Sequence, residues 1–421
     1  MKILTLVASL GKGGVERTAQ IFAEGYQALG VDSRVLAVVK GGPREEYLQS
    51  KGIPFWIGIH DRSMKEIREW NPEAIHIHSH GFDLENNPFL CDLLANRIVV
   101  EKNIFSRPVP WTHRTNYSYQ LSCWCDWRFC TFAPQLASKA VIVPNAAIAT
   151  SFIRAAAEEV MAFKQQYNIP GQALVIGRIG QHFETKWSPV LIHAFNRLAK
   201  KYDSLHLLLV NPSKRIVAQA GTSPFSKRIT IIDYILGDTS LSTAYSAMDI
   251  FALAADQGES FGNVLAEAML CEVPVVALST PWGDNSQCEV TGHRQGGLIA
   301  LSPTGFRKAL DALIRDPQLR ETLGRTGRKR IMEKYDYLKV AQQSLDIIQG
   351  KIRPEKRHDL DQKIIAIYKD AFDRPSPLTL FFLKKKKYLW MTRYTTQYEP
   401  VRHLLSKVYG MMRSRLKPRR D

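Results

Sequence analysis

The sequence contains little cysteine, with 6 in 421 residues. Six cysteines in a chain of this length do not form the disulfide framework of a small secreted protein. Cys123, Cys125 and Cys130 cluster, but their spacing offers no fourth ligand and no second C-x2-C pair of the kind that structural zinc sites use. We therefore expect free thiols and no bound metal.

Long apolar runs are also missing. No stretch approaches the roughly 18 to 20 uninterrupted apolar residues that a membrane-spanning helix needs. The apolar segment at Ile3–Val7 meets the turn Gly11–Gly14 too soon for a signal peptide with a small-residue cleavage site. These features predict a cytoplasmic protein.

Acidic residues are outnumbered, 40 Asp and Glu against 57 Lys and Arg, for a net charge of +17. The excess is local, because residues 351–421 hold 19 of the basic and 7 of the acidic residues, a net +12. A nearly balanced body with a basic tail disfavours a nucleic-acid groove built across the whole protein.

Short apolar runs alternate with helical patterns through residues 1–350, which is typical of parallel sheets covered by helices. This pattern predicts a first doubly wound domain over 1–168 and a second over 169–350, followed by a basic tail at 351–421. The expected strands are Ile3–Ala8, Ser33–Val39, Ala74–His78, Ile98–Val100 and Ala140–Val143, then Leu174–Ile179, Leu205–Val210, Ile229–Ile232, Ile250–Ala254 and Val273–Leu278. The aromatic segment 105–134 lacks a clear period and is interpreted as a functional loop or a pair of short helices.

Two turns follow predicted strands in equivalent places. Gly13 and Gly14 follow the first strand, where backbone N–H groups at a helix start can face an anion. Arg178 and Lys186 surround the loop after the first strand of the second domain, and they could clamp a diphosphate. An ordinary turn and solvated surface charge are the alternatives for these two segments.

The most specific pattern is a pair of carboxylates separated by seven residues, Glu259 and Glu267. Between them, Gly262 permits close approach of a ligand, and Asn263 is the expected cap of a helix whose first N–H groups, that of Val264 included, would face a phosphate. Nothing in the sequence pairs the two acids across a scissile bond, as an acid/base pair of a hydrolase would require. We interpret them as acceptors of hydrogen bonds from sugar hydroxyls.

These residues resemble the retaining group 1 glycosyltransferases of family 4, which have the GT-B fold of two facing Rossmann-like domains. The resemblance covers about residues 1–350. It rests on the two spaced glutamates with the following run Ala268–Ala277, on Gly177-Arg178 with Lys186, and on Gly13–Glu16.

The resemblance implies a nucleotide-diphosphate sugar as donor, a glycan or lipid-linked acceptor on the first domain, and no divalent metal. Arg178 and Lys186 would neutralise the diphosphate, with Glu259 on the sugar hydroxyls and Glu267 on the ribose. Gly13, Gly14, Gly262, Asn263 and Val264 would complete the donor site. Transfer would retain the anomeric configuration, and cell-envelope polysaccharide or lipopolysaccharide synthesis would be the setting.

The sequence departs from the family pattern in places. Trp187 replaces a usual glycine after Lys186 and is expected to pack on the donor or on the core. Asn103 stands where the family often has a histidine near the reacting sugar. His80, at the end of an alternating histidine run, and His113 are the other candidates for contact with acceptor or donor.

Three further polar residues fall in a loop that adjoins the donor in the family. They are Asp284, Asn285 and Glu289. Each is a candidate contact to donor or acceptor, and an ordinary surface turn is the alternative.

The tail combines the apolar run Leu378–Leu383, the basic run Lys384–Lys387 and interleaved aromatic residues. This composition favours a helical anchor at an anionic membrane surface, with docking on the protein's own body as the alternative and nucleic acid as a weaker one. We expect a peripheral glycosyltransferase at the inner face of the cell membrane. An inactive nucleotide-sugar-binding protein, or a hydrolase or epimerase of nucleotide sugars, would share the same cleft.

Overall fold

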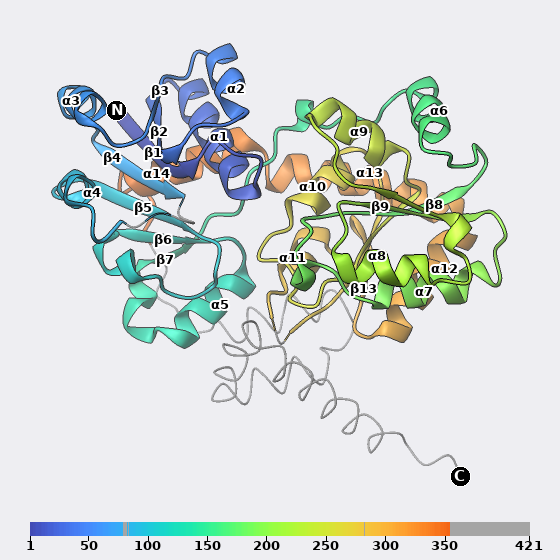
Figure 1. The fold of residues 1–421 in the computed structure, drawn as a ribbon. Coiled ribbons are helices and arrows are strands. Elements are labelled where there is room, and N and C mark those ends of the chain that lie inside the picture. The colour runs from blue at the N-terminus through green and yellow to red at the C-terminus, as the bar shows by residue number, and fades with distance from the viewer. Residues whose placement is uncertain (79–81, 83, 282, 354–421) are drawn as a thin grey trace, which may run out of the picture.

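The computed structural model describes residues 1–78, 82, 84–281 and 283–353, which form two α/β domains (Figure 1). His80 and residues 354–421 of the predicted tail lie outside the described residues.

The described residues of the first domain form one seven-stranded parallel sheet in the order β3-β2-β1-β4-β5-β6-β7. Its strands are β1 (Lys2–Ser9), β2 (Asp32–Lys40), β3 (Phe55–Ile57), β4 (Ala74–His78), β5 (Ile98–Asn103), β6 (Tyr117–Gln120) and β7 (Ala140–Ile142). Its helical segments are α1 (Gly14–Ala28), α2 (Arg44–Ser50), α3 (Asp61–Trp70), α4 (Pro88–Leu94), η1 (Pro110–Arg114), α5 (Cys123–Phe132) and η2 (Pro134–Lys139). The strand order reverses between β1 and β4, which opens a crevice at their carboxyl ends.

The second sheet, within the part of the chain that the structure describes, has six parallel strands in the order β10-β9-β8-β11-β12-β13. They are β8 (Leu174–Ile179), β9 (Leu205–Val210), β10 (Ile229–Ile232), β11 (Ile250–Leu253), β12 (Val275–Leu278) and β13 (Gly297–Ala300). Buried on both faces, most of these strands are runs of Val, Ile, Leu and Ala. The order reverses between β8 and β11, so a second crevice opens there.

The helical segments after β7 connect the domains or cover the second sheet, except for the last, which returns to the first domain. They are η3 (Ala149–Ser151), α6 (Ala157–Gln166), η4 (Glu184–Lys186), α7 (Val190–Ala199), α8 (Lys214–Gly221), η5 (Ser226–Arg228), α9 (Asp238–Ser246), α10 (Asn263–Leu270), α11 (Ser286–Thr291), α12 (Pro303–Arg315), α13 (Pro317–Lys334) and α14 (Tyr337–Ile348).

Three strands were not expected from the sequence. β3, β6 and β13 are three or four residues long, and β6 reads Tyr-Ser-Tyr-Gln, which has no apolar run. The segment 105–134 therefore contains a strand between η1 and α5, where only loop or helix was predicted. Within the described residues, no helix has both the length and the apolar character needed to cross a bilayer.

The last described helix, α14, returns to the first domain and packs on α1 (Figure 1). The Ser344 hydroxyl lies 2.6 Å from the Tyr26 hydroxyl and 2.9 Å from that of Tyr119, all three in the interior. Close packing is possible because Gly25 faces Ala341: a Cβ added at Gly25 would lie 2.7 Å from the Ala341 Cβ. The first domain is thus completed by residues from the far end of the described chain.

We expect Gly25→Val to lower the free energy of unfolding by about 1–3 kcal/mol, because added methyl groups in a close-packed contact force the two helices apart. Chemical denaturation followed by circular dichroism measures the change. Gly221→Ala is the matched control, because a Cβ there meets nothing within 4 Å, and it should stay within about 0.5 kcal/mol of wild type. Equal stability of the two variants would contradict the close contact.

Candidate active site

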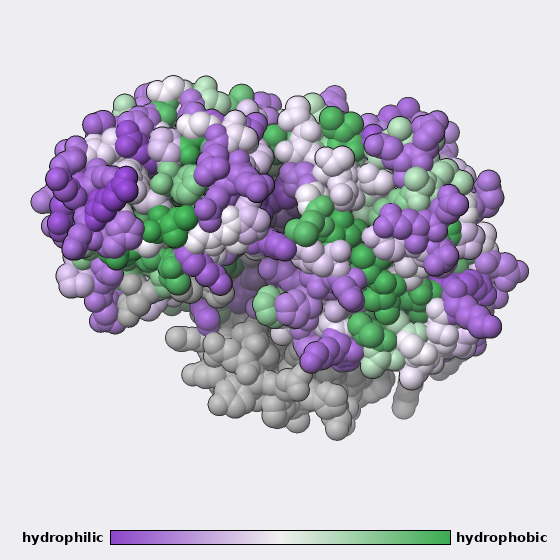
Figure 2. All heavy atoms as spheres, turned by 45° about the horizontal axis from the view of Figure 1, so that its top comes forward, coloured by the Kyte–Doolittle hydropathy of each residue, from purple (hydrophilic) through white to green (hydrophobic). Residues whose placement is uncertain are grey.

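The glycine turn after β1 faces the start of α10 across the two domains. A Cβ added at Gly14 would lie 3.4 Å from Asn263 Nδ2. Asn145, in the connection after β7, donates a 2.9 Å hydrogen bond to Asn263 Oδ1. Figure 2 shows a recess between the domains, lined on this face mainly by hydrophilic residues. Two segments that the sequence singled out separately are therefore brought to one place.

The helix α10 begins one residue earlier than expected. Gly262 is its N-cap, with a left-handed φ of 84°, and Asn263 is the first helical residue. The prediction that Asn263 caps the helix is therefore wrong, and its side chain is free to meet Asn145 instead. The first-turn N–H groups, Val264 included, belong to the turn in which a helix leaves donors without intrahelical acceptors. This end of α10 opens toward the glycine turn.

Glu259 and two cations form a compact cluster at the carboxyl end of β8. Lys186 Nζ lies 2.6 Å from Glu259 Oε2, and Arg178 Nη2 lies 3.6 Å from Glu259 Oε1. Arg178 is 1% exposed, whereas Lys186 is 25% exposed. The two cations that the sequence predicted to bind a diphosphate thus share one carboxylate in this structure.

Aromatic rings hold the Arg178 guanidinium in place. It lies 5.4 Å from the ring centre of Trp187 and 5.6 Å from that of Phe251. Trp187 packs in the core, and its indole N–H donates to the Gln181 carbonyl at 2.7 Å. Burial lowers the pKa of Arg178, while the Glu259 carboxylate raises it. Its Nε and Nη1 atoms are buried without a hydrogen-bond partner, so the guanidinium retains donor capacity.

Glu267 has partners from both domains. The Tyr245 hydroxyl donates to its Oε2 at 2.7 Å, and Arg17 of α1 approaches its Oε1 to 3.9 Å. Arg17 also makes two hydrogen bonds, of 2.9 and 2.7 Å, to the carboxylate of Asp238. The sequence reasoning missed Arg17, Asp238 and Tyr245; the one available signal was that Arg17 lies three residues after the glycine turn.

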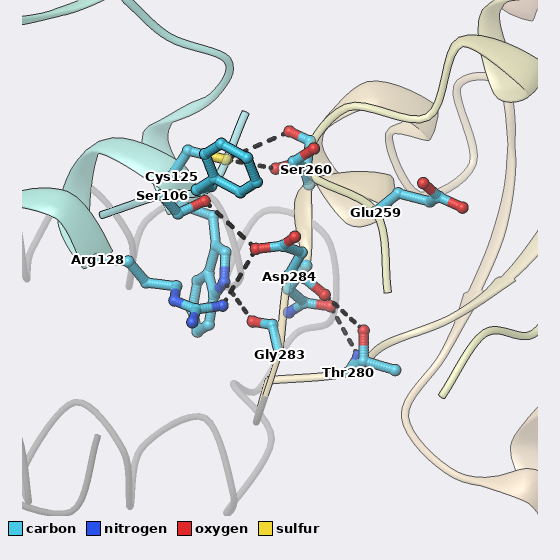
Figure 3. Close-up of polar contacts among 12 residues, drawn as sticks. Ser106, Cys125, Arg128, Glu259, Ser260, Thr280, Gly283 and Asp284 are labelled. Atoms are coloured by element: carbon cyan, nitrogen blue, oxygen red, sulfur yellow. Dashed lines mark hydrogen bonds and ion pairs between the residues drawn. The ribbon is translucent and has the colours of Figure 1, made fainter. Parts of the chain in front are cut away.

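Helix α5 contacts the loop that precedes α11 (Figure 3). Arg128 Nη1 lies 3.1 Å from Asp284 Oδ1, and the Ser106 hydroxyl donates to the same oxygen at 3.3 Å. Burial raises the pKa of Asp284, and the charge of Arg128 lowers it. In Figure 3 the Glu259 carboxylate points away from α5, but the charge of Lys186 still lowers the pKa of Asp284 and that of Glu259 raises it. In the structure, Asp284 is an interdomain ion-pair partner.

Asn285 and Glu289 also have structural contacts. Asn285 Oδ1 accepts from the Thr280 N–H at 2.8 Å, inside the second domain. Glu289 accepts a hydrogen bond from the Cys123 N–H at 3.0 Å and so lies at the N-terminus of α5. The helix dipole stabilises a carboxylate in this position. Burial raises the pKa of Glu289, and the hydrogen bond from Cys123 lowers it.

Asn103 and His113 make contacts with other residues of the first domain. Asn103 is 3% exposed, and its side chain bonds the Phe105 N–H and the Arg107 carbonyl, so it supports the loop after β5. His113 is exposed in η1. Among the described residues, no group of three or more His, Cys, Asp or Glu side chains is arranged to hold a metal ion.

Comparison with known proteins shows which proteins this chain resembles in sequence and in fold. Residues 171–316 match the family model described as glycosyl transferases group 1. The Anabaena protein Alr3699/HepE, solved in complex with UDP and glucose, superposes with a TM-score of 0.67 at 18% identity, over 83% of this chain and 100% of that one. The fold is GT-B, as the sequence predicted.

Two curated relatives are similar mainly in part of their length. The capsular polysaccharide biosynthesis glycosyltransferase CapM of Staphylococcus aureus is 26% identical over 38% of this chain and 42% of that protein. The phosphatidyl-myo-inositol mannosyltransferase of Mycobacterium tuberculosis is 26% identical over 50% of this chain and 54% of that protein. The chain thus spans about half the length of these relatives. Residues 171–316 are thus similar to the group 1 glycosyltransferases, and both relatives are glycosyltransferases by name.

The Glu259 cluster generates a prediction that needs no sugar. We expect Glu259→Gln to bind inorganic pyrophosphate more tightly than wild type. In wild type the Glu259 carboxylate competes with the pyrophosphate for Lys186 and Arg178. One charge at about 4 Å is worth about 1 kcal/mol even in water, which corresponds to roughly a fivefold gain. Isothermal titration calorimetry measures the affinity. Lys186→Gln is the matched variant and should lose affinity; unchanged binding by Glu259→Gln would contradict the competition.

Proposed function

We propose that the protein is a retaining glycosyltransferase of family 4 that moves a sugar from a nucleotide-diphosphate donor to a glycan or lipid-linked glycan. The observation that carries this proposal is the cluster of Arg178, Lys186 and Glu259, at the crevice of the second sheet and beside the start of α10. Open parallel sheets bind ligands at such a reversal of strand order. The glycine turn of the first domain closes the opposite side.

Each charged group has a distinct part in this proposal. Arg178 and Lys186 stabilise the negative charge that develops on the departing diphosphate, so no divalent metal is required. On donor binding Glu259 exchanges its cations for sugar hydroxyls, and the released cations meet the phosphates. The helix start at Gly262, Asn263 and Val264 adds N–H groups and a favourable dipole.

Retention follows from a same-face transfer. The bond from the anomeric carbon to the diphosphate oxygen breaks, and the acceptor oxygen bonds the same face of the sugar. The acceptor's proton passes to the departing phosphate oxygen, so the protein supplies electrostatic stabilisation and position and no covalent nucleophile.

The acceptor class is proposed from the relatives and from the composition of the tail. The relatives include a capsular polysaccharide biosynthesis glycosyltransferase and a phosphatidyl-myo-inositol mannosyltransferase. The basic and aromatic composition of residues 351–421 suits an anionic lipid surface. We therefore propose a peripheral enzyme of envelope polysaccharide or lipopolysaccharide synthesis.

The proposal is tested with a panel of radiolabelled nucleotide sugars and a lipid extract as acceptor source. Wild type should transfer label from one donor, and proton NMR of the product should show the donor's anomeric configuration. Arg178→Ala and Glu259→Ala should lower the rate at least about 100-fold, because each removes charge or hydroxyl contacts used in the transition state. Full activity in either variant would contradict the roles, and turnover without acceptor would indicate a hydrolase or epimerase instead.

The membrane role is tested separately in the full chain. Replacing Lys384–Lys387 by Gln should reduce co-sedimentation with vesicles of anionic lipid, because each basic residue near such a surface contributes about 1 kcal/mol. The control replaces four exposed lysines of the body, Lys51, Lys65, Lys201 and Lys329, and removes the same charge. Equal sedimentation of the two variants would contradict a tail-specific anchor.

A further inference from the structure

We propose that Arg17 is a positioning residue that makes the ribose-binding competence of Glu267 depend on closure of the two domains. The inference rests on the proposed function, in which Glu267 accepts hydrogen bonds from the donor ribose. Arg17 belongs to α1 of the first domain, whereas Glu267 and its partner Tyr245 belong to the second.

Contacts with Asp238 and Phe152 hold the Arg17 side chain in one position. Its guanidinium forms a two-bond pair with Asp238, with N–O distances of 2.9 and 2.7 Å, and lies 4.8 Å from the ring centre of Phe152. Its side chain is 15% exposed. A planar guanidinium held by two bonds and an aromatic ring has little freedom, so its direction toward Glu267 is fixed while Asp238 of the second domain is in contact.

The different distances of the Asp238 and Glu267 carboxylates from Arg17 support this role. Asp238, the first residue of α9, takes both short bonds, while Glu267 stays 3.9 Å from Arg17 Nη1. Glu267 therefore gains the favourable charge of Arg17 without losing its acceptor oxygen to a short bond. Tyr245 occupies Oε2, which leaves Oε1 to accept from a ribose hydroxyl. The nearby cation also offsets part of the cost of burying this carboxylate.

The contact couples two events because the cation and the carboxylate lie on different domains. When the domains separate, Glu267 loses the Arg17 charge that helps to hold its carboxylate in the observed position. Thermodynamic reciprocity then requires that a nucleotide bound to Glu267 favours the closed arrangement by the same free energy. Arg178 and Lys186 differ in this respect, since they and Glu259 all belong to the second domain.

This difference defines the experiment. The nucleoside diphosphate that wild type binds among UDP, GDP, ADP and CDP, and the matching monophosphate, are titrated by calorimetry. Arg17→Ala should raise both dissociation constants by the same factor, about fivefold or more for a coupling of this kind. Lys186→Ala should weaken the diphosphate more than the monophosphate. Arg17→Lys should recover part of the loss, which also guards against a folding defect in the alanine variant.

A double-mutant cycle isolates the pathway. In a Glu267→Gln background, Arg17→Ala should change the affinity by less than about twofold, because its target charge is gone. Small-angle scattering should show nucleotide-dependent compaction in wild type and a smaller change in Arg17→Ala. Arg62→Ala, which removes an exposed arginine paired with Glu66 on α3, is the control and should bind as wild type does.

The outcomes are distinct. Unchanged monophosphate affinity in Arg17→Ala overturns the inference while leaving the proposed function standing. A loss confined to the diphosphate also overturns it, because Arg17 would then act on the phosphates. If wild type binds no nucleotide, the proposed function fails, and the inference fails with it.

Discussion

Charged groups in the interdomain cleft are satisfied by the opposite domain, and the arrangement of the molecule depends on this pairing. Arg17 meets Asp238 and Glu267, Arg128 meets Asp284, and Glu289 accepts from the N-terminus of α5. Removing charges from water is costly, and partners across the cleft offset much of that cost. Because the partners in these pairs belong to different domains, the pairs stabilise the arrangement of the two domains seen here.

The cluster proposed as the catalytic centre differs from these pairs, because its charged groups come from a single domain. Arg178, Lys186 and Glu259 all belong to the second domain, and two aromatic rings and the core hold the guanidinium regardless of closure. The two cations are thus preorganised, and in the absence of a bound anion the Glu259 carboxylate balances their charge. In the proposed function the second domain supplies the cations for the diphosphate, and in the further inference the first domain supplies Arg17 to the ribose site.

Much of the fold was accessible from the sequence. The strands β8, β9 and β10 were predicted at their observed bounds, because buried parallel strands are continuous apolar runs. β6 was missed because Tyr-Ser-Tyr-Gln has no apolar run, and β13 because the four residues Gly297–Ala300 are too few to establish a period. Asn103 and Asn285 were candidates for ligand contact, yet their side chains support loops, since polar residues at strand ends and in turns satisfy backbone groups as often as they bind ligands.

The sequence by itself determined the local elements, the glycine turns and the residue types at the ends of strands, because these follow from short-range backbone sterics and apolar periodicity. Only the tertiary structure decided the pairs. Lys186 and Glu259 are 73 residues apart, and Arg17 and Asp238 are 221 residues apart. Side chains so distant meet through the packing of two sheets and the return of α14 onto α1. No local pattern encodes those contacts.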